Sequence, residues 1–260
     1  MTRLDVWLAE HGLAESREKA QALVMAGRVQ VGGQPAAKPG APVREGASVS
    51  VEAGPRQVGR GALKLAGALD AFGVDPADRV AVDVGASTGG FTVVLLARGA
   101  ARVYAVDVGR GQLHERLRQD PRVIVRDRTN ARQLSPDVVP EPCALAVMDV
   151  SFISVRLILP ALRGVLDPGG EAVVLVKPQF EVGRGQVGKG GVVRDPALHL
   201  QALREVAESA QSQGYGVRGA CASPVAGAKG NREFFLHLAP GASPLPADEL
   251  LALMRKAVER

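Results

Sequence analysis

Cysteine and histidine are scarce and scattered in this sequence. Its 260 residues include two isolated cysteines and four histidines that do not cluster along the chain: Cys143, Cys221, His11, His114, His199 and His237. Disulfide frameworks and zinc sites place such residues at short, repeated spacings. The sequence therefore supports neither, and we expect no bound metal.

Long hydrophobic runs are also missing. No apolar stretch approaches the roughly 18 residues that a membrane-spanning helix requires. The first residues, MTRLDVWLAE, are amphipathic and do not resemble a secretory signal. We therefore expect a cytoplasmic protein that has no membrane partner.

Aromatic side chains make up only 3% of the chain, whereas apolar and charged residues are as frequent as in ordinary globular proteins. The length is typical of one large or two modest domains. A net charge of +5 and a pI near 9.5 favour a phosphate-bearing partner that is held by charge. On charge alone, a solvated basic surface is an equally good interpretation.

Residues 1–53 differ in pattern from the rest. Apolar residues recur at helical spacing over 4–8 and 20–24, residues 28–33 form a strand pattern that ends in a turn, and residues 47–51 form an alternating strand. Gly54-Pro55 interrupts this pattern, and no periodicity resumes before Leu63. We therefore predict a small helix-and-strand domain over 1–53, a linker over 54–62 and a second domain over 63–260.

The second domain alternates strand and helix patterns. The strand candidates are RVAVDVG, ARVYAVDV, RVIVRD, CALAVMDV, EAVVLVK, YGVRGACASPV and REFFLHLA, and helical stretches such as FTVVLLARG, VRLILPALRGVL and PALHLQALREVAESAQSQG separate them. This alternation predicts an α/β fold with a doubly wound, Rossmann-like sheet. A loop joins the last two strands, so we expect one of them to be antiparallel. Further helices are expected over 63–72 and 247–260.

A glycine-rich turn follows the first of these strands. Its spacing differs from the G-x-G-x-x-G of pyrophosphate binders, which disfavours a nicotinamide dehydrogenase. Asp83 would repel a pyrophosphate but suits an amino-acid ammonium, and a tight glycine turn packs against an uncharged nucleoside. Both groups occur in S-adenosylmethionine. We therefore predict that its site includes Asp83, Gly85, Ser87, Thr88, Gly89 and Gly90.

Two more aspartates end the second and third strands. Asp107 is placed for hydrogen bonds to ribose hydroxyls, and Asp127 could reach an adenine amino group. The alternatives are that Asp83 is a capping or turn residue and that Asp127 is a surface carboxylate.

Four charged residues lie beside recognisable elements: Lys64, Asp149, Lys177 and Glu233. Asp149 and Lys177 close apolar strands, and the carboxyl ends of parallel strands converge on one crevice. Buried charges there require either an ion pair or a chemical role. A structural ion pair remains the alternative for each of them.

Several motifs resemble the TlyA (hemolysin A) family of ribosomal RNA 2'-O-methyltransferases, which have an FtsJ-like catalytic domain. They are RGALKLAGALDAFGV, VDVGASTGGFT, VYAVDVGRGQL, MDVSFISVRLILP, LVKPQFEVGR, GKGGVVRDP and NREFF, and the resemblance covers nearly the whole chain. It implies S-adenosylmethionine as methyl donor, ribosomal RNA as substrate with cytidine as the modified nucleoside, and ribosomal subunits as partners. Two positions depart from the family: residues 59–62 read Gly-Arg-Gly-Ala where Ser-Arg-Gly-Gly is usual, and Val93 replaces an Asp.

The same resemblance implies a Lys-Asp-Lys-Glu catalytic tetrad at Lys64, Asp149, Lys177 and Glu233. A ribose hydroxyl is a poor nucleophile, so the enzyme has to align it and remove its proton. We expect Lys177 to be the general base and Lys64 to steady the developing alkoxide. Asp149 would orient Lys177, and Glu233 would hold Lys64 or the ribose.

Two basic segments are expected to contact RNA. The run SREKAQALVMAGRVQVGGQPAAKPG resembles the RNA-binding domain named after ribosomal protein S4, which implies phosphate contacts from Arg17, Lys19, Arg28 and Lys38. The glycine-rich run FEVGRGQVGKGGVVRD resembles a loop that folds over RNA, with contacts from Arg184, Lys189 and Arg194. The alternative for both segments is a solvated basic surface. Oligomeric state is not predicted.

Two other functional classes remain open. A non-catalytic RNA-binding or ribosome-assembly factor could have the same fold, although the tetrad favours an enzyme. A membrane-lytic function is suggested only by the older hemolysin name. The sequence shows no strongly amphipathic basic helix, which counts against this function.

Overall fold

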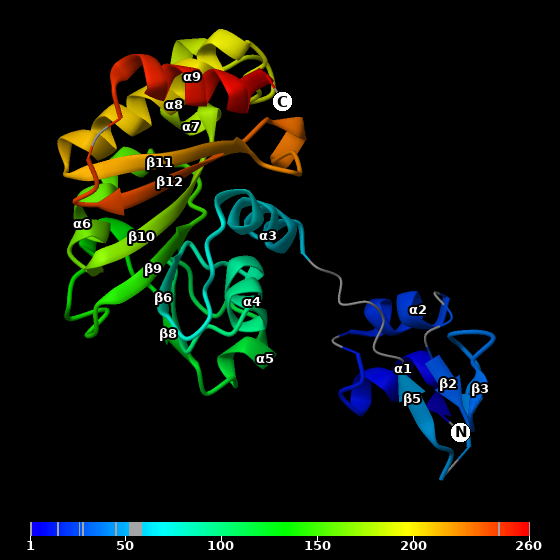
Figure 1. Cartoon of the computed structure of the whole chain (residues 1–260). Coiled ribbons are helices and arrows are strands. Elements are labelled where there is room, and N and C mark those ends of the chain that lie inside the picture. The colour runs from blue at the N-terminus through cyan, green and yellow to red at the C-terminus, as the bar shows by residue number, and fades with distance from the viewer. Residues whose placement is uncertain are drawn as a thin grey trace. The chain divides into compact units, whose positions relative to one another are not determined.

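The computed structural model describes residues 2–14, 16–25, 27, 29–44, 46–51, 59–243 and 245–259, without the side chains of Lys19, Ala22 and Arg184. The chain divides into two compact units, residues 1–58 and 59–260 (Figure 1). Each unit has its own hydrophobic core.

The N-terminal unit is small and combines two helices with short strands. Its elements are β1 (Thr2–Arg3), α1 (Leu4–Glu10), α2 (Arg17–Met25), β2 (Val29–Val31), β3 (Gln34–Pro35), β4 (Pro42–Val43) and β5 (Val49–Val51). Strand β2 pairs antiparallel with β3 and β5, and β1 pairs with β4. The buried core contains the apolar residues whose spacing predicts the two helices, including Leu4, Leu8, Ala20 and Val24.

The second unit contains a seven-stranded sheet. In sequence order its strands are β6 (Val80–Val84), β7 (Arg102–Val106), β8 (Val123–Arg126), β9 (Cys143–Met148), β10 (Leu166–Val176), β11 (Tyr215–Ala222) and β12 (Phe234–Pro240). Their order across the sheet is β11-β12-β10-β9-β6-β7-β8. The five strands from β10 to β8 are parallel, and β12 runs antiparallel to both of its neighbours. The predicted α/β sheet, in which one of the last two strands in the sequence is antiparallel, is confirmed.

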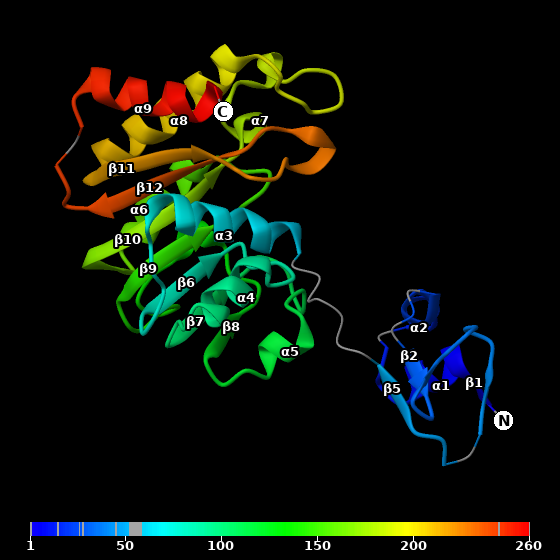
Figure 2. The same ribbon diagram turned by 45° about the vertical axis from the view of Figure 1, so that its right-hand side comes forward.

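Helices cover both faces of this sheet (Figures 1 and 2). On one face, α3 (Arg60–Phe72) and α4 (Gly90–Ala97) share a core with inward-facing residues such as Ala81 and Val173. On the other face, α6 (Leu159–Arg163), α8 (Pro196–Ser212) and α9 (Ala247–Glu259) pack against residues such as Val82 and Val174. Successive strand residues therefore enter different cores, as expected for a sheet that is covered on both sides.

Short helices occupy several connections. They are α5 (Glu115–Arg118), α7 (Pro178–Glu181) and the 3-10 turns η1 (Ala131–Gln133), η2 (Val155–Leu157), η3 (Arg184–Gln186) and η4 (Ala228–Gly230).

Three predicted boundaries differ from the structure. Helix α3 begins at Arg60 rather than Leu63, so residues 60–62 are helical and not part of the linker. The long helix predicted over 155–166 is instead a 3-10 turn that ends at Leu157, followed by the short helix α6, which ends at Arg163. Leu166 already belongs to β10, which reaches its main pairing at Glu171 after a register shift. The helical spacing of apolar residues over 155–166 did not predict the break between the 3-10 turn and α6, or the start of β10 at Leu166.

Candidate active site

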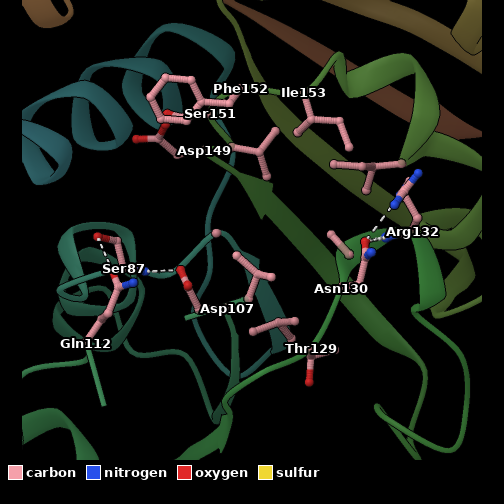
Figure 3. A pocket seen from close by; sticks show the side chains of 16 residues that line it. Ser87, Asp107, Gln112, Thr129, Asn130, Arg132, Asp149, Ser151, Phe152 and Ile153 are labelled. Atoms are coloured by element: carbon pink, nitrogen blue, oxygen red, sulfur yellow. Dashed lines mark hydrogen bonds between the residues drawn. The ribbon is translucent and has the colours of Figure 1, made fainter. Parts of the chain in front are cut away.

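A cavity opens beside the carboxyl ends of β6, β7 and β9. The strand order reverses between β6 and β9, and such a switch point leaves a crevice in a doubly wound sheet. The cavity has a volume of about 520 Å³, which is within the usual range for small-molecule sites. Figure 3 shows Ser87, Asp107, Thr129, Asn130 and Asp149 around it.

The glycine turn after β6 forms one wall. Gly85 has a φ of 86°, and a Cβ atom there would lie 2.4 Å from the backbone oxygen of Asp149. Only glycine combines this left-handed conformation with so close an approach. Asp107 then fixes the turn, because its carboxylate accepts hydrogen bonds from the backbone amides of Ser87 (2.8 Å) and Gly109 (2.7 Å).

The predicted cofactor residues separate into two groups. Gly85, Ser87 and Asp107 line the cavity. The other five are not among its lining residues: Asp83, Thr88, Gly89, Gly90 and Asp127. Gly89 still has a conformational role, because its φ is 98° and a Cβ atom would lie 2.1 Å from Leu117.

Asp83 is completely buried behind the turn. Thr92 Oγ1 donates a 2.6 Å hydrogen bond to one carboxylate oxygen, and the other oxygen has no partner in the part of the chain that the structure describes. Burial raises the pKa of Asp83 to about 7. Such a carboxyl is poorly stabilised in its charged form and would gain from a nearby cation.

Asp127 has partners elsewhere. It accepts a hydrogen bond from the backbone amide of Gly111 at 3.1 Å and pairs with Arg118 at 3.2 Å. These donors, the Gly111 amide first, lower the pKa of its carboxyl. The structure thus places Asp127 in a local ion pair and does not bring it to the cavity.

Several lining residues were not predicted from the sequence. They include Val106, Val108 and Gln112, and from the segments that follow β8 and β9 they include Thr129, Asn130, Arg132 and residues 150–153. The one available signal was their position just after a predicted strand end.

The four candidate catalytic residues form two ion pairs. Lys177 Nζ lies 2.6 Å from Asp149 Oδ1 and donates a 2.8 Å hydrogen bond to Ser151 Oγ. Lys64 Nζ lies 2.6 Å from Glu233 Oε2, and both side chains are nearly buried. Among the described residues, no hydrogen bond or ion pair joins the two pairs. The structure therefore brings the four residues together as two separate ion pairs, Lys177 with Asp149 and Lys64 with Glu233.

The loop that contains Gly227 helps to hold the ion pair of Lys64 and Glu233 in place. A Cβ atom at Gly227 would lie 1.9 Å from Glu233 Oε1, so the absence of a side chain there lets Glu233 reach Lys64. Arg60 donates hydrogen bonds to the backbone oxygens of Ala226 (2.5 Å) and Gly227 (3.1 Å), which fixes the same loop.

A buried carboxylate fixes the loop after β9. Glu181, in α7, accepts hydrogen bonds from Ser154 Oγ at 2.5 Å and from the backbone amide of Val155 at 2.9 Å. Burial raises its pKa. This contact joins the loop that carries Asp149 and Ser151 to the segment that follows Lys177.

Both units match known families. The FtsJ-like methyltransferase family matches residues 57–239, and the S4 domain matches residues 2–49. The 16S/23S rRNA (cytidine-2'-O)-methyltransferase TlyA of Mycobacterium tuberculosis is 50% identical over 91% of this chain and 89% of its own. The chain belongs to the TlyA (hemolysin A) family. It is therefore an enzyme of the methyltransferase class.

Two further proteins support the TlyA assignment. The YqxC protein of Bacillus subtilis is 47% identical and covers 98% of this chain and 93% of its own. A solved structure of a hemolysin from Streptococcus thermophilus has a TM-score of 0.74 and 42% identity, and it covers 99% of this chain and 95% of its own. The similarity thus includes both units.

The RNA-contact candidates of this TlyA-family chain have different surroundings. Arg17 is about half exposed, and its Nε donates a 3.0 Å hydrogen bond to the buried Asp5. Lys38, Lys189 and Arg194 are exposed. The predictions for Arg28 and for the side chains of Lys19 and Arg184 lie outside the described part of the chain.

The described residues contain neither a membrane-spanning helix nor a metal-binding cluster. None of the helices in these ranges has the length and apolar character needed to cross a membrane. Nor do three or more His, Cys, Asp or Glu side chains gather there in an arrangement that could hold a metal ion.

Proposed function

We propose that this protein transfers a methyl group from S-adenosylmethionine to the ribose 2'-hydroxyl of a cytidine in ribosomal RNA. The observation that carries the proposal is the Lys177 amine, which is largely buried and held by Asp149 and Ser151 beside the cavity. The similarity to relatives supports the substrate class, since the TlyA of Mycobacterium tuberculosis is named for cytidine-2'-O-methylation of 16S and 23S rRNA.

The residues around the first cavity fit the proposed cofactor. The volume suits a nucleoside-sized ligand, Gly85 lets it approach the backbone, and Asp107 offers a carboxylate for two ribose hydroxyls. Bound there, S-adenosylmethionine would supply an activated methyl group. Asp83 lies outside the lining, so we assign it mainly to holding Thr92 at the start of α4.

These assignments predict unequal effects on cofactor binding. Asp107→Ala should weaken S-adenosylmethionine binding by about 1 to 3 kcal/mol, because a charged hydrogen-bond acceptor is lost. Asp83→Ala should have a smaller effect, because Asp83 does not line the cavity. Calorimetric titration of both folded variants with S-adenosylmethionine shows which one loses more affinity. Unchanged affinity in Asp107→Ala would mean that Asp107 is not part of the cofactor site.

Lys177 is the proposed general base. The hydroxyl oxygen forms a bond to the methyl carbon, its proton passes to the lysine amine, and the bonding electron pair of the methyl group stays with its donor. Asp149 and Ser151 fix the amine in position.

Lys64 is the proposed cation that steadies the developing alkoxide. Its ion pair with Glu233, 2.6 Å from Nζ to Oε2, holds the side chain in position. The two ion pairs therefore have different proposed tasks, in which one removes a proton and the other supplies positive charge.

Lys177→Ala tests the catalytic assignment. We expect methyl transfer to fall by a factor of about 10² to 10⁴ or more, with S-adenosylmethionine affinity nearly intact. Lys256→Ala, which removes an exposed lysine on α9 that has no assigned role, is the control. Rates are measured with isolated ribosomal subunits and radiolabelled S-adenosylmethionine. Appreciable residual turnover in Lys177→Ala would exclude this residue as the base.

The substrate assignment needs a separate experiment. Ribose methylation is mapped in rRNA from cells with and without this protein, and a cytidine whose 2'-O-methyl group depends on the protein is the expected result. If no ribose position changes, a non-catalytic role in ribosome assembly becomes the better explanation.

A further inference from the structure

Two loops meet near the ion pair of Lys64 and Glu233. One joins α7 to α8 and is rich in glycine, and the other joins β11 to β12 and leads into Glu233. They lie side by side, at the end of the sheet where β10 finishes (Figures 1 and 2). The residues that join the two loops do not line the cofactor cavity.

The glycine-rich loop is buried at its ends and exposed at its tip. Val182 and Val193 are buried in a small apolar cluster against α8. Between them the chain turns back on itself, because the backbone amide of Gly188 donates a 3.2 Å hydrogen bond to the backbone oxygen of Val192. Lys189 at the tip is exposed. The position of the tip therefore depends on how firmly the two ends are held.

One buried side chain fastens this loop to its neighbour. Asn231 is 3% exposed and lies in the loop between β11 and β12. Its Oδ1 accepts a 3.0 Å hydrogen bond from the backbone amide of Val193, and its Nδ2 donates to the backbone oxygens of Gly191 (2.9 Å) and Ala228 (3.2 Å). These three bonds need an acceptor and two donors in one short side chain, which is what an asparagine amide offers.

Helix α8 provides a second hold on Val193. His199 is 1% exposed, and its Nε2 lies 2.9 Å from the backbone oxygen of Val193. A carbonyl oxygen only accepts, so the histidine ring carries a proton on Nε2 and donates it. His199 thus joins the glycine-rich loop to α8, whereas Asn231 joins it to the loop that leads into Glu233.

Asn231 also fixes the backbone that lies against Glu233. Its backbone oxygen accepts a 2.7 Å hydrogen bond from the amide of Gly227, and its side chain holds Ala228. A Cβ atom at Gly227 would lie 1.9 Å from Glu233 Oε1, so the carboxylate rests directly against this backbone. A shift of Gly227 would therefore move the carboxylate that holds Lys64.

We propose that Asn231 is a positioning residue for methyl transfer, which fixes both the tip of the glycine-rich loop and the Glu233 carboxylate. An RNA phosphate bound at Lys189 is thereby held in a fixed position relative to Lys64. The role in catalysis rests on the proposed function, because Lys64 and Glu233 act there on an RNA ribose.

Trypsin cleavage measures the hold on the loop without any substrate. The loop offers cleavage sites after Lys189 and Arg194. Proteases cut such segments when the chain opens locally, so the rate reports how firmly the loop is held. Full-length Asn231→Ala should be cut at these two sites about five- to tenfold faster than the wild type. Mass spectrometry of the fragments identifies the sites.

Single-turnover methyl transfer to isolated ribosomal subunits measures the effect on Glu233. At saturating RNA, Asn231→Ala should lower the rate about tenfold, with S-adenosylmethionine affinity unchanged. Glu233→Gln keeps the shape of the side chain and loses its charge. In a Glu233→Gln background, Asn231→Ala should lower the rate by no more than about twofold, because the group through which Asn231 acts is already altered.

Tyr215→Phe is the matched control. The buried Tyr215 hydroxyl donates a 3.1 Å hydrogen bond to the backbone oxygen of Leu159, and it lies at the far end of β11 from the loop. Its loss should leave both rates unchanged. Thermal unfolding checks that each variant is folded. Asn231→Asp, which keeps the acceptor for Val193 and loses both donors, is the second variant if Asn231→Ala proves unstable.

Two results would overturn the proposal. Cleavage of the Asn231 variants at the wild-type rate would mean that Asn231 does not hold the loop. An equal loss of methyl-transfer rate with and without Glu233→Gln would mean that Asn231 does not act through Glu233. If the wild type methylates no ribose at all, the proposed function itself fails, whereas the trypsin result still tests the hold on the loop.

Discussion

Each of the two units contains a completely buried aspartate, and the two aspartates have opposite surroundings. Asp5, in α1 of the N-terminal unit, accepts hydrogen bonds from the side chains of Arg3, Arg17 and Gln21. Asp83, in β6, accepts one from Thr92, and its other oxygen has no partner among the described residues. The Arg3 hydrogen bond is the largest of several effects that hold the pKa of Asp5 well below its usual range. Burial raises the pKa of Asp83 to about 7.

The comparison shows that burial alone does not decide the charge of a carboxyl group. Three side chains and the backbone amide of Val6 donate hydrogen bonds that compensate Asp5 for the loss of water, whereas one hydroxyl does not compensate Asp83. The consequences for function differ as well. Asp5 holds Arg3 and Arg17, whose side chains stay about half exposed, whereas Asp83 is enclosed behind the turn that shapes the cofactor cavity.

The largest expected effect is on the pH dependence of stability through Asp83. Its folded pKa lies above the unfolded value of 3.8, so the native state binds the extra proton between about pH 4 and pH 7. The unfolding free energy should therefore fall as pH rises through this window, by up to about 1.4 kcal/mol per pH unit. Asp83→Asn should remove that contribution.

Urea unfolding of the wild type and Asp83→Asn at pH 5, 6, 7 and 8 measures this difference. Asp83→Asn should gain stability relative to the wild type as pH increases. A constant difference between the two proteins would show that Asp83 is charged in the folded state over the whole range.

Asp5 should give a pH dependence of stability with the opposite sign to that of Asp83. Its folded pKa is depressed, so its contribution is present above the unfolded pKa and is lost as pH falls towards the folded one. Asp5→Asn should lower the Tm of the N-terminal unit at pH 7, and the difference from the wild type should shrink towards pH 3. Circular dichroism melts at both pH values check this. An equal Tm at pH 7 would mean that its hydrogen-bond donors stabilise the carboxylate little.

The smallest expected effect compares two RNA-contact candidates. Asp5 orients Arg17, whereas Lys38 is exposed and pairs with no described carboxylate. Arg17→Gln should therefore weaken RNA binding more than Lys38→Gln, because a held side chain loses less entropy on binding. Each variant should reduce the slope of log affinity against log salt by about 1.

RNA affinity at several salt concentrations tests this order. Because Arg17 also stabilises Asp5, melting curves must show that Arg17→Gln is folded. If both variants bind RNA with wild-type affinity and slope, the S4-like unit does not hold RNA through these residues.

Local sequence patterns predicted most of the fold. The alternation of apolar strands and amphipathic helices predicted all seven strands of the large sheet. The loop between the last two predicted that one of them is antiparallel, and the structure shows that it is β12. Periodicity failed at residues 155–166, where a 3-10 turn, a short helix and the start of β10 occur within one helical pattern. The breaks there depend on how the segment packs against the sheet, and local spacing does not contain that information.

The candidate site was only partly predictable. Strand-end positions correctly indicated that Asp149 and Lys177 would meet, because parallel strands end at a common edge. The same reasoning did not anticipate that Asp127 would pair with Arg118 or that residues 129–132 would line the cavity. Position after a strand indicates the edge of the sheet, but the direction of each side chain depends on the loop that follows.

The sequence by itself determined the elements, the family and the chemical types of the candidate residues. A glycine turn, strand-end acids and two lysines are visible in it because backbone geometry and side-chain chemistry are local properties. Only the tertiary structure decided which charged side chains form ion pairs and which buried carboxyl group has few hydrogen-bond donors around it. Those features depend on residues that are far apart in the chain, such as Lys64 and Glu233, and on water that is excluded only when the whole unit has folded.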